Sequence, residues 1–373
     1  MHIEVMIYVY MAVCTAMILF NCAMVVVNGR QKRHKDRPDR QLSRRISQQL
    51  DRLEAGNGVE EAHIRWIAAK LRHTENMRAF DANMELMQKA GAAGIQPYLE
   101  ALRPVFLSLA DCYCEGEPLK ASYFAYVVRK YHMARRGSFD SLTEHMMRLL
   151  HSPSVYAREN AIHIIYDLGD PDCAIRALHM LDNCRIFHHP KLIHDGLLEF
   201  RGDRNELLSA LWKEFGQFSA EMQTALVNYM RLSGGGCDEQ VFNLMTRAGQ
   251  DDEVYFACMR YFGRFTYAPA YPVLLENLRG GEGRRWEFAA VAAAVLRNYP
   301  GQQTAEQLKA ALHSSAWYVR ANAAESLEAL GIGYAELAAV FEGNDRYARE
   351  ILQYRMDFRR AKTQEKEKEA LTI

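Results

Sequence analysis

The residues of this sequence most able to bind a metal ion are gathered in one short stretch. His188 and His189 stand side by side, with Cys184 before them and His194 after them. Zinc is held by three or four such ligands that converge at about 2.0–2.3 Å. The histidine pair precedes Pro190 and is typical of a loop between helices, and His194 lies a full turn inside the following helix. We therefore expect loop and surface histidines here, and no metal site.

Other catalytic motifs are absent from the sequence. Asp251, Asp252 and Glu253 could bind a cation, but acids at a helix start also complement the helix dipole, and we expect them to cap a helix. There is no glycine-rich phosphate loop, no Gly-x-Ser-x-Gly elbow and no nucleophile beside an obvious base. The eight cysteines follow no regular framework, as is typical of free thiols in a reducing compartment. We predict no catalytic residue, no cofactor and no enzymatic activity.

One region combines aromatic rings with arginine. Residues 255–271 are unusually aromatic, and helical spacing places most of these rings in a core. Aromatic and arginine side chains are enriched at the centres of protein interfaces. The predicted partner-binding patch consists of the side chains expected to stay exposed there and at the next repeat start, namely Arg264, Tyr267, Arg284 and Arg285.

The elements that would position these residues are repeats. Residues 154–342 contain one helical unit about six times, with a period near 33. In the two clearest copies, Arg158 and Arg320 each precede a small residue by three positions and a helix-ending glycine by eleven. The same register places the small or apolar position on Ala161, Gly196, Leu226, Cys258, Ala290 and Ala323. A fixed period of this length indicates helical pairs that bury their apolar faces by stacking.

The whole chain is predicted to be all-α, because no stretch shows sustained strand alternation with hairpin turns. The predicted fold is an α-solenoid of helical hairpins preceded by a single transmembrane helix. Its expected parts are a transmembrane signal-anchor at 1–29, a basic juxtamembrane segment and linker helix at 30–58, a helical N-terminal cap region at 59–152, the repeats at 153–344, and a charged C-terminal helix and tail at 345–373.

The repeats resemble HEAT repeats, most clearly over 139–182 and 314–342. In that family the recurring Val-Arg, Ala and Leu-Gly positions lie on or beside the first helix of each hairpin. The intermediate copies depart from the pattern, because their Arg position holds Ile193, Gln223, Tyr255 and Glu287. These departures leave armadillo-like or other helical-hairpin repeats as alternatives. HEAT proteins are mostly scaffolds, so the resemblance implies that a protein partner binds along a curved surface. The fold alone does not name that partner.

Some proteins with HEAT-like repeats are enzymes, so we compare the sequence with what those enzymes require. The family of deoxyhypusine hydroxylase needs several His-Glu dipeptides for its metal centre, and this chain contains none. HEAT-like DNA glycosylases use a basic groove, and the mildly acidic composition of the chain after residue 45 does not predict one. Chromophore-handling proteins such as bilin lyases have no strict motif. They leave open the alternative of an enzyme or chromophore-handling protein with a site in the concave face.

The N-terminal segment is predicted to anchor the chain in a membrane. Val5 to Val27 is an uncharged run of 23 residues, which is long enough to cross a bilayer as a helix. Eight Lys or Arg side chains follow between Arg30 and Arg45, so the positive-inside rule places the N-terminus outside and the solenoid in the cytoplasm. The basic residues nearest the anchor would also meet anionic lipid headgroups: Arg30, Lys32, Arg33 and Lys35.

The charge balance argues against nucleic acid as a partner. The chain has 46 basic and 46 acidic residues, but the eight basic charges between residues 30 and 45 leave the remaining body mildly acidic. We predict a single-pass, membrane-anchored cytoplasmic scaffold that binds a protein, such as a membrane-associated enzyme or an envelope-assembly complex. The short anchor and compact body favour a bacterial source. A lipid-binding adaptor that uses the basic block is a second alternative.

Overall fold

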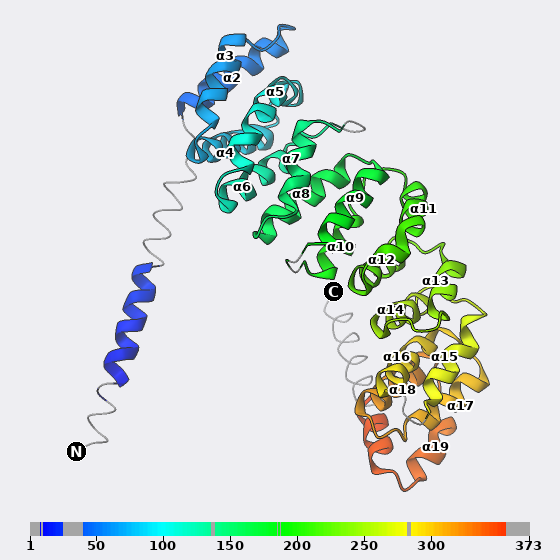
Figure 1. Ribbon diagram of the computed structural model, residues 1–373. Helices are drawn as coiled ribbons and strands as arrows, with labels where there is room; N and C mark the ends of the chain where they lie inside the picture. The colour runs from blue at the N-terminus through cyan, green and yellow to red at the C-terminus, as the bar shows by residue number, and fades with distance from the viewer. Residues whose placement is uncertain are drawn as a thin grey trace. The chain divides into compact units, whose positions relative to one another are not determined.

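The computed structural model describes residues 8, 10–24, 40–135, 139–184, 186, 188–281 and 285–355 of the 373-residue chain. Over these ranges the chain forms helices and their connections, and no strand is present (Figure 1). The predicted all-α class is confirmed. The described residues divide into two compact units, the first reaching to Ile186 and including Phe200–Asp203, the second formed by Phe187–Glu199 and the residues from Arg204 onward.

The first unit contains eight labelled helices within the described ranges. These are α2 (Arg40–Glu54), α3 (Glu61–Leu71), α4 (Thr74–Lys89), α5 (Ile95–Cys114), α6 (Pro118–Lys130), α7 (Ser141–Leu149), α8 (Val155–Asp167) and α9 (Pro171–Asp182). Helices close in the chain contact one another: α3 contacts α5, α5 contacts α7, α4 contacts α6, and α6 contacts α8. Odd-numbered helices therefore pack against odd-numbered helices, and even-numbered helices against even-numbered ones.

The second unit repeats this arrangement. Its helices are α10 (Pro190–Leu197), α11 (Arg204–Glu214), α12 (Ala220–Leu232), α13 (Asp238–Met245), α14 (Asp252–Phe262), α15 (Ala270–Arg279), α16 (Trp286–Val295), α17 (Gln302–Ala311), α18 (Trp317–Ala329) and α19 (Tyr334–Glu342), followed by helical residues 346–355. Contacts run from α10 to α12, α14, α16 and α18 in turn, and each of α14, α16 and α18 also contacts the helix just before it.

The predicted repeat register falls on consecutive even-numbered helices. The six small or apolar positions lie one each on α8, α10, α12, α14, α16 and α18, and all six are buried. Two of the predicted helix-ending glycines, Gly169 and Gly331, have φ of 70° and 75°, a left-handed conformation that glycine adopts without the strain of a Cβ. One sequence position thus performs the same packing role in each copy.

The Arg position of the repeat has a structural task. Nη1 of Arg158 donates to the carbonyl oxygens of Ser152 at 2.7 Å and Pro153 at 3.3 Å. Nη1 of Arg320 donates to Ser314 and Ser315 at 2.6 and 3.0 Å.

Gln223, which departs from the family pattern, does the same work. Its amide nitrogen donates to the carbonyl oxygen of Phe218 at 2.8 Å, again five residues back. In all three copies a long side chain on the first helix satisfies a carbonyl group of the turn before it, which leaves that side chain unavailable for chemistry.

A short segment beyond α10 belongs to the first unit. The backbone N–H of Arg201 donates to the carbonyl oxygen of Tyr166 at 3.2 Å, and the Arg201 guanidinium lies 2.9 Å from the Asp167 carboxylate. Gly202 lies against Gly169, and a Cβ built on Gly202 would stand 2.2 Å from the Gly169 carbonyl oxygen. We call residues 200–203 the return segment. It closes the turn between α8 and α9.

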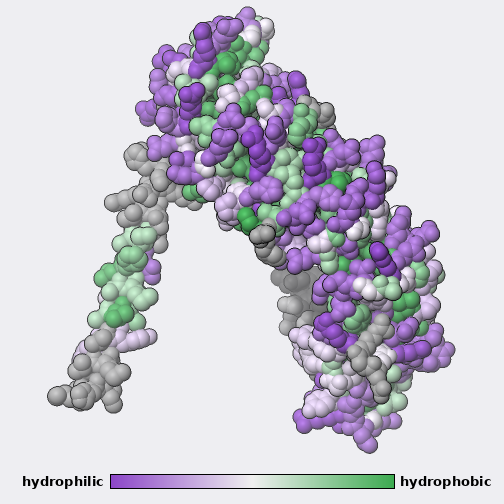
Figure 2. Space-filling model, in the orientation of Figure 1, coloured by the Kyte–Doolittle hydropathy of each residue, from purple (hydrophilic) through white to green (hydrophobic). Residues whose placement is uncertain are grey.

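The described part of the N-terminal apolar run, residues 10–24, is helical. Figure 2 shows its largely apolar surface, to which exposed Met17, Ile18, Leu19 and Phe20 contribute. No helix found among the described residues has the length and apolar character needed to cross a membrane. The rest of the predicted anchor at 1–29 lies outside those residues, as do Arg30, Lys32, Arg33 and Lys35.

His63 on α3 gives the first unit a predicted dependence on pH. Its ring is buried, and Nε2 lies 2.8 Å from the Tyr98 hydroxyl. Burial, helped by the charge of Arg45, lowers the pKa of His63 to about 4. The unfolded chain therefore binds a proton that the folded chain resists, so stability is complete above the ordinary pKa of 6.5 and falls as the pH drops towards 4.

We expect this effect to reach about 2–3 kcal/mol at pH 4. Urea unfolding at pH 7 and pH 4.5 measures it, with His63→Gln as the comparison, because glutamine can still bond to Tyr98 but does not titrate. The difference in unfolding free energy between the two pH values should shrink in the variant. An unchanged difference would assign the acid sensitivity to other groups.

Candidate functional site

The largest gathering of exposed aromatic side chains in the second unit lies at the starts of successive first helices. Trp286 opens α16, Trp317 and Tyr318 open α18, and Tyr347 lies in the first turn of helix 346–355. Their exposed fractions are 45%, 56%, 57% and 64%. Large aromatic side chains are usually well buried, so several exposed ones together point to a surface that another molecule covers. We call these four residues the aromatic row.

Tyr318 contacts the rings of Trp286 and Trp317 within the aromatic row. The centroids of Trp286 and Tyr318 are 5.4 Å apart with planes inclined by 10°, so these rings stack. Trp317 stands edge-on to Tyr318, with centroids 5.0 Å apart and an angle of 81°. Both arrangements are favourable for aromatic pairs. The mutual contacts restrain the rings before any partner arrives, which reduces the entropy lost on binding.

Helices α16 and α18 fix the spacing of the row. They contact each other directly, and small residues such as Ala290 and Ala323 are buried on them. Two side chains of α18 donate hydrogen bonds to carbonyl oxygens of α16: Asn322 to Ala290 at 2.8 Å and Ser326 to Ala293 at 2.6 Å. These bonds hold the two helix starts in one register, and so keep Trp286 opposite Tyr318.

Two arginines flank the rings. Arg285 pairs with Asp252 at 2.7 Å and with Glu287 at 2.8 Å, and its hydrogen bond to Glu287 is the main reason that the pKa of this exposed guanidinium is raised. The guanidinium carbon of Arg320 lies 5.3 Å from the ring centroid of Tyr347, which is a cation–π distance. The row therefore combines apolar faces with guanidinium groups at its edges, of which that of Arg285 is paired with two carboxylates.

A cavity of about 400 Å³ opens beside Trp286. It lies between the end of α15, the start of α16 and the end of α17, and Arg285, Ala289, Gln307 and His313 are among its lining residues. Its size lies near the lower end of the range of ligand sites in proteins, and it can admit a side chain of a partner. The row is thus a ridge of rings beside a small hollow.

The structure separates Arg264 from Arg285, two residues of the predicted patch. Arg285 lies at the start of α16, beside Asp252 at the start of α14, whereas Arg264 follows the end of α14. Eleven helical residues of α14, about 16 Å along the axis, lie between these places. Arg284 lies outside the described residues.

Tyr267 is a packing residue more than a surface residue. Its ring stacks on Phe262, with centroids 5.8 Å apart, and meets Phe242 edge-on at 5.7 Å. Its backbone N–H donates to the Tyr299 hydroxyl at 3.1 Å. Arg264 is exposed. Among the described residues of the predicted patch, Arg285 is the one that lines the cavity beside Trp286.

The sequence predicted Arg285, which flanks the aromatic row, but it did not predict the four aromatic residues of the row. A usable signal was present, because Trp317 lies two positions before buried Val319, and two positions are about 200° around a helix. A large ring opposite a buried residue must face outward. The stacking of Trp286 on Tyr318 has no such signal, because it depends on how α16 and α18 pack.

The acidic residues predicted to cap a helix and the histidine stretch can also be located in the structure. Asp251 accepts from the N–H of Glu253 at 2.9 Å, so the predicted capping of α14 is confirmed. The ring of His194 lies 2.9 Å from the Asp195 carboxylate. Within the parts of the chain that the structure describes, no three His, Cys, Asp or Glu side chains are placed to hold a metal ion.

Comparisons with known proteins find similarity among solved structures. No protein-family profile matches the chain, and no curated protein matches it. Among solved structures, it is similar to human deoxyhypusine hydroxylase in complex with glycerol. The two chains share 16% sequence identity, the similarity covers 80% of this chain and 96% of that chain, and the TM-score is 0.27.

Proposed function

We propose that the protein is a HEAT-like α-solenoid scaffold, held at a membrane by its N-terminal helix, that docks a protein partner on the aromatic row. The observation that carries this proposal is the exposure of Trp286, Trp317 and Tyr318, with the Tyr318 ring in contact with the other two, on a pair of hydrogen-bonded helices. Trp and Tyr are among the residues that dominate protein interfaces. The favoured partner surface is a folded protein with an apolar cleft that admits these rings.

Two features support the solenoid. Within each unit the helices contact their near neighbours in the chain, and alternate helices lie beside each other. The period near 33 places equivalent buried residues on successive even-numbered helices, and the hydrogen bonds of Arg158, Gln223 and Arg320 repeat at an offset of five residues. Such equivalence is the mark of a repeat architecture.

The membrane anchor rests on the N-terminal helix and on charge. Apolar side chains are exposed around residues 10–24, including Met11, Val13, Leu19 and Phe20, and a helix apolar on all sides needs an apolar environment. The basic residues that follow it favour a cytoplasmic body and contact with anionic lipid through Arg30, Lys32, Arg33 and Lys35. Anchoring would raise the local concentration of a docked partner, a gain that needs no catalytic residue or cofactor.

The test is affinity purification of the full chain from gently solubilised membranes, followed by titration with each co-purifying protein in pure form. We expect one protein whose affinity falls about tenfold or more in the Trp317→Ala/Tyr318→Ala variant, since central interface rings contribute most of the binding energy. Tyr334→Ala is the matched control, because Tyr334 is 60% exposed on α19 and lies outside the row.

Three outcomes separate the possibilities. Loss of affinity in the row variant with an unchanged Tyr334→Ala control supports docking on the row. Equal affinity of both variants would move the docking site elsewhere, and Arg264→Ala then tests the remaining exposed residue of the predicted patch. Recovery of no protein that binds the pure chain would contradict the scaffold function itself.

A further inference from the structure

A second candidate site lies in the first unit and is unrelated to the aromatic row. A groove of about 820 Å³ runs between α4, α6 and α8, which lies within the range of ligand sites in proteins. Its apolar lining consists of Tyr123, Tyr126, Tyr156 and Leu119, and its polar lining comes from the first turn of α4 and from parts of α6 and α8. We call it the tyrosine groove.

The groove offers aromatic faces to solvent. Tyr156 and Leu119 are 68% and 72% exposed, and Tyr126 is 38% exposed. The rings of Tyr123 and Tyr126 stack, with centroids 5.8 Å apart and planes inclined by 29°, and the guanidinium of Arg78 lies 5.5 Å from the Tyr123 centroid. Three tyrosine rings therefore line one groove, and the exposed rings of Tyr126 and Tyr156 are available to an apolar group.

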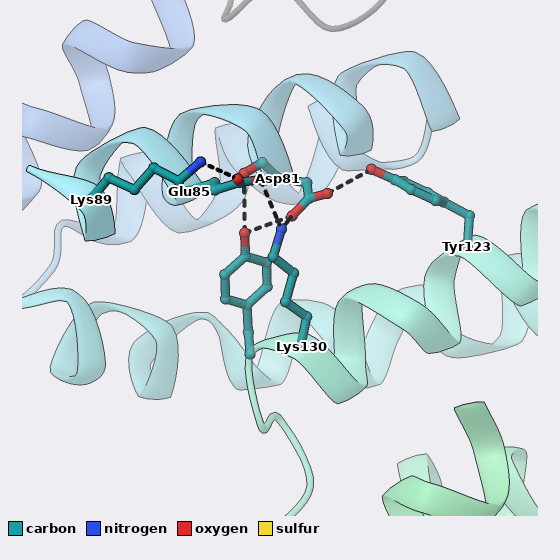
Figure 3. Close-up of polar contacts among 6 residues, drawn as sticks. Asp81, Glu85, Lys89, Tyr123 and Lys130 are labelled. Carbon is teal, nitrogen blue, oxygen red and sulfur yellow. Dashed lines mark hydrogen bonds and ion pairs between the residues drawn. The ribbon is translucent and has the colours of Figure 1, made fainter. Parts of the chain in front are cut away.

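An ionic network holds Tyr123, one of the lining residues, by its hydroxyl group (Figure 3). The Tyr123 hydroxyl donates to the Asp81 carboxylate at 3.1 Å, and Nζ of Lys130 donates to the same carboxylate at 2.7 Å. The Tyr131 hydroxyl also donates to it, at 2.7 Å. Burial and the neighbouring Asp81 charge raise the pKa of Tyr123, so its phenol stays protonated and keeps this bond. This hydrogen bond to Asp81 therefore restrains the Tyr123 ring.

Most polar groups of the lining are already used within the protein. The Asn76 amide donates to the Lys70 carbonyl and the Asn160 amide to the Tyr156 carbonyl, both at 2.9 Å. Ser122 bonds to the carbonyl oxygen of Pro118 at 2.6 Å. The groove thus has aromatic faces in plenty and few polar groups left for a ligand.

The charges of the lining cancel. Glu75 and Glu117 carry the negative charges, and Arg78 and Lys120 carry the positive charges. Lys120 and Glu117 pair at 3.3 Å. A groove with balanced charge has no preference for a phosphate, a nucleotide or a strongly acidic peptide. An uncharged ligand suits it better.

We propose that the tyrosine groove binds a proline-rich peptide segment in the polyproline II conformation. Proline rings are compact and apolar, and proline-rich segments dock in aromatic-lined grooves. A proline has no N–H group, so such a ligand needs no acceptor from a lining whose polar groups are engaged. Its carbonyl groups point outward, since polyproline II has no internal hydrogen bonds, and the Arg78 and Lys120 side chains at the rim can donate to them.

A sugar chain is the main competitor for aromatic faces, and the lining disfavours it. Each sugar ring carries several hydroxyl groups that both donate and accept hydrogen bonds. Burying them without partners costs about 1–3 kcal/mol each. The amides of Asn76 and Asn160, which would serve a sugar best, each already donate one hydrogen bond to a backbone carbonyl, which leaves each amide nitrogen a single N–H for a sugar.

The experiment titrates fluorescein-labelled decaproline into the full chain in mild detergent and follows fluorescence anisotropy. We expect saturable binding that weakens about fivefold or more in Tyr156→Ala and in Tyr126→Ala. Tyr156→Phe keeps the ring and should restore the affinity of the native chain. Tyr334→Ala, on the second unit, is the control that should leave binding unchanged.

The outcomes are distinct from those of the scaffold test. No saturable binding of decaproline up to ~1 mM would overturn the proposal, as would equal affinity of the native chain and both alanine variants. Competition by maltohexaose at lower concentration than unlabelled decaproline would also overturn it and assign the groove to sugars. The Trp317→Ala/Tyr318→Ala variant should bind decaproline normally, so failure of one proposal leaves the other intact.

Discussion

Gly202→Ala should destabilise the first unit by about 3 kcal/mol or more, the largest effect that we expect from any single substitution. The added Cβ would stand 2.2 Å from the carbonyl oxygen of Gly169 and 2.6 Å from the Phe200 ring. A ring can rotate away, but the carbonyl oxygen belongs to the backbone of the turn between α8 and α9. The return segment must therefore move, and the bonds of Arg201 to Tyr166 and Asp167 are lost with it.

Urea unfolding followed by circular dichroism measures this loss, with Gly58→Ala as the control. Gly58 also lies in a connection of the first unit, but a Cβ there would meet no atom within 4 Å. The control should unfold at the native urea concentration or slightly above it, because alanine restricts the unfolded chain. Equal midpoints for Gly202→Ala and the native chain would show that the return segment is not held against the turn.

Asp81→Ala should cost about 3 kcal/mol of unfolding free energy. The carboxylate of Asp81 accepts from Lys130, Tyr131 and Tyr123, and only 13% of its side chain is exposed. Its removal leaves the Lys130 ammonium with Glu85 as its remaining carboxylate partner in the network, and removing one member of a buried ionic network is strongly destabilising. Thermal unfolding of both proteins at pH 7 gives the difference.

Glu85→Ala is the matched control for that experiment. Glu85 lies one turn further along α4 and pairs with Lys130 and Lys89, but its side chain is 45% exposed. Exposed ion pairs contribute little, so we expect a loss below about 1 kcal/mol. Asp81→Ala should also weaken decaproline binding, because it releases the Tyr123 ring. If the two variants lost equal stability, burial of the Asp81 carboxylate would not be the reason for its importance.

The sequence predicted the helices well because local signals determine them. The linker helix expected within 30–58 is α2, and helices α3 to α7 lie in the cap region expected at 59–152. Apolar spacing, glycines at helix ends and prolines at helix starts all act within a few residues. The repeat register followed for the same reason, since each buried position recurs at nearly constant spacing.

The candidate sites were harder to predict, because side chains far apart in the sequence form them. Arg264 and Arg285 are close in sequence but lie at opposite ends of helices that run side by side. The tyrosine groove collects residues from α4, α6 and α8, and the sequence contains no local pattern that joins Tyr123 to Tyr156. Gln223 shows the opposite case. It departs from the family pattern, and yet its side chain donates to the carbonyl oxygen five residues back, as the arginines do in the other copies.

Near-neighbour contacts between helices have a consequence for how each unit folds. When most contacts join segments close in the chain, only short loops must close before two helices meet, and folding is fast. Loss of one helix then removes support mainly from those next to it, so unfolding can begin locally and spread. Amide hydrogen exchange should therefore vary smoothly along each unit, slowest in helices with neighbours on both sides.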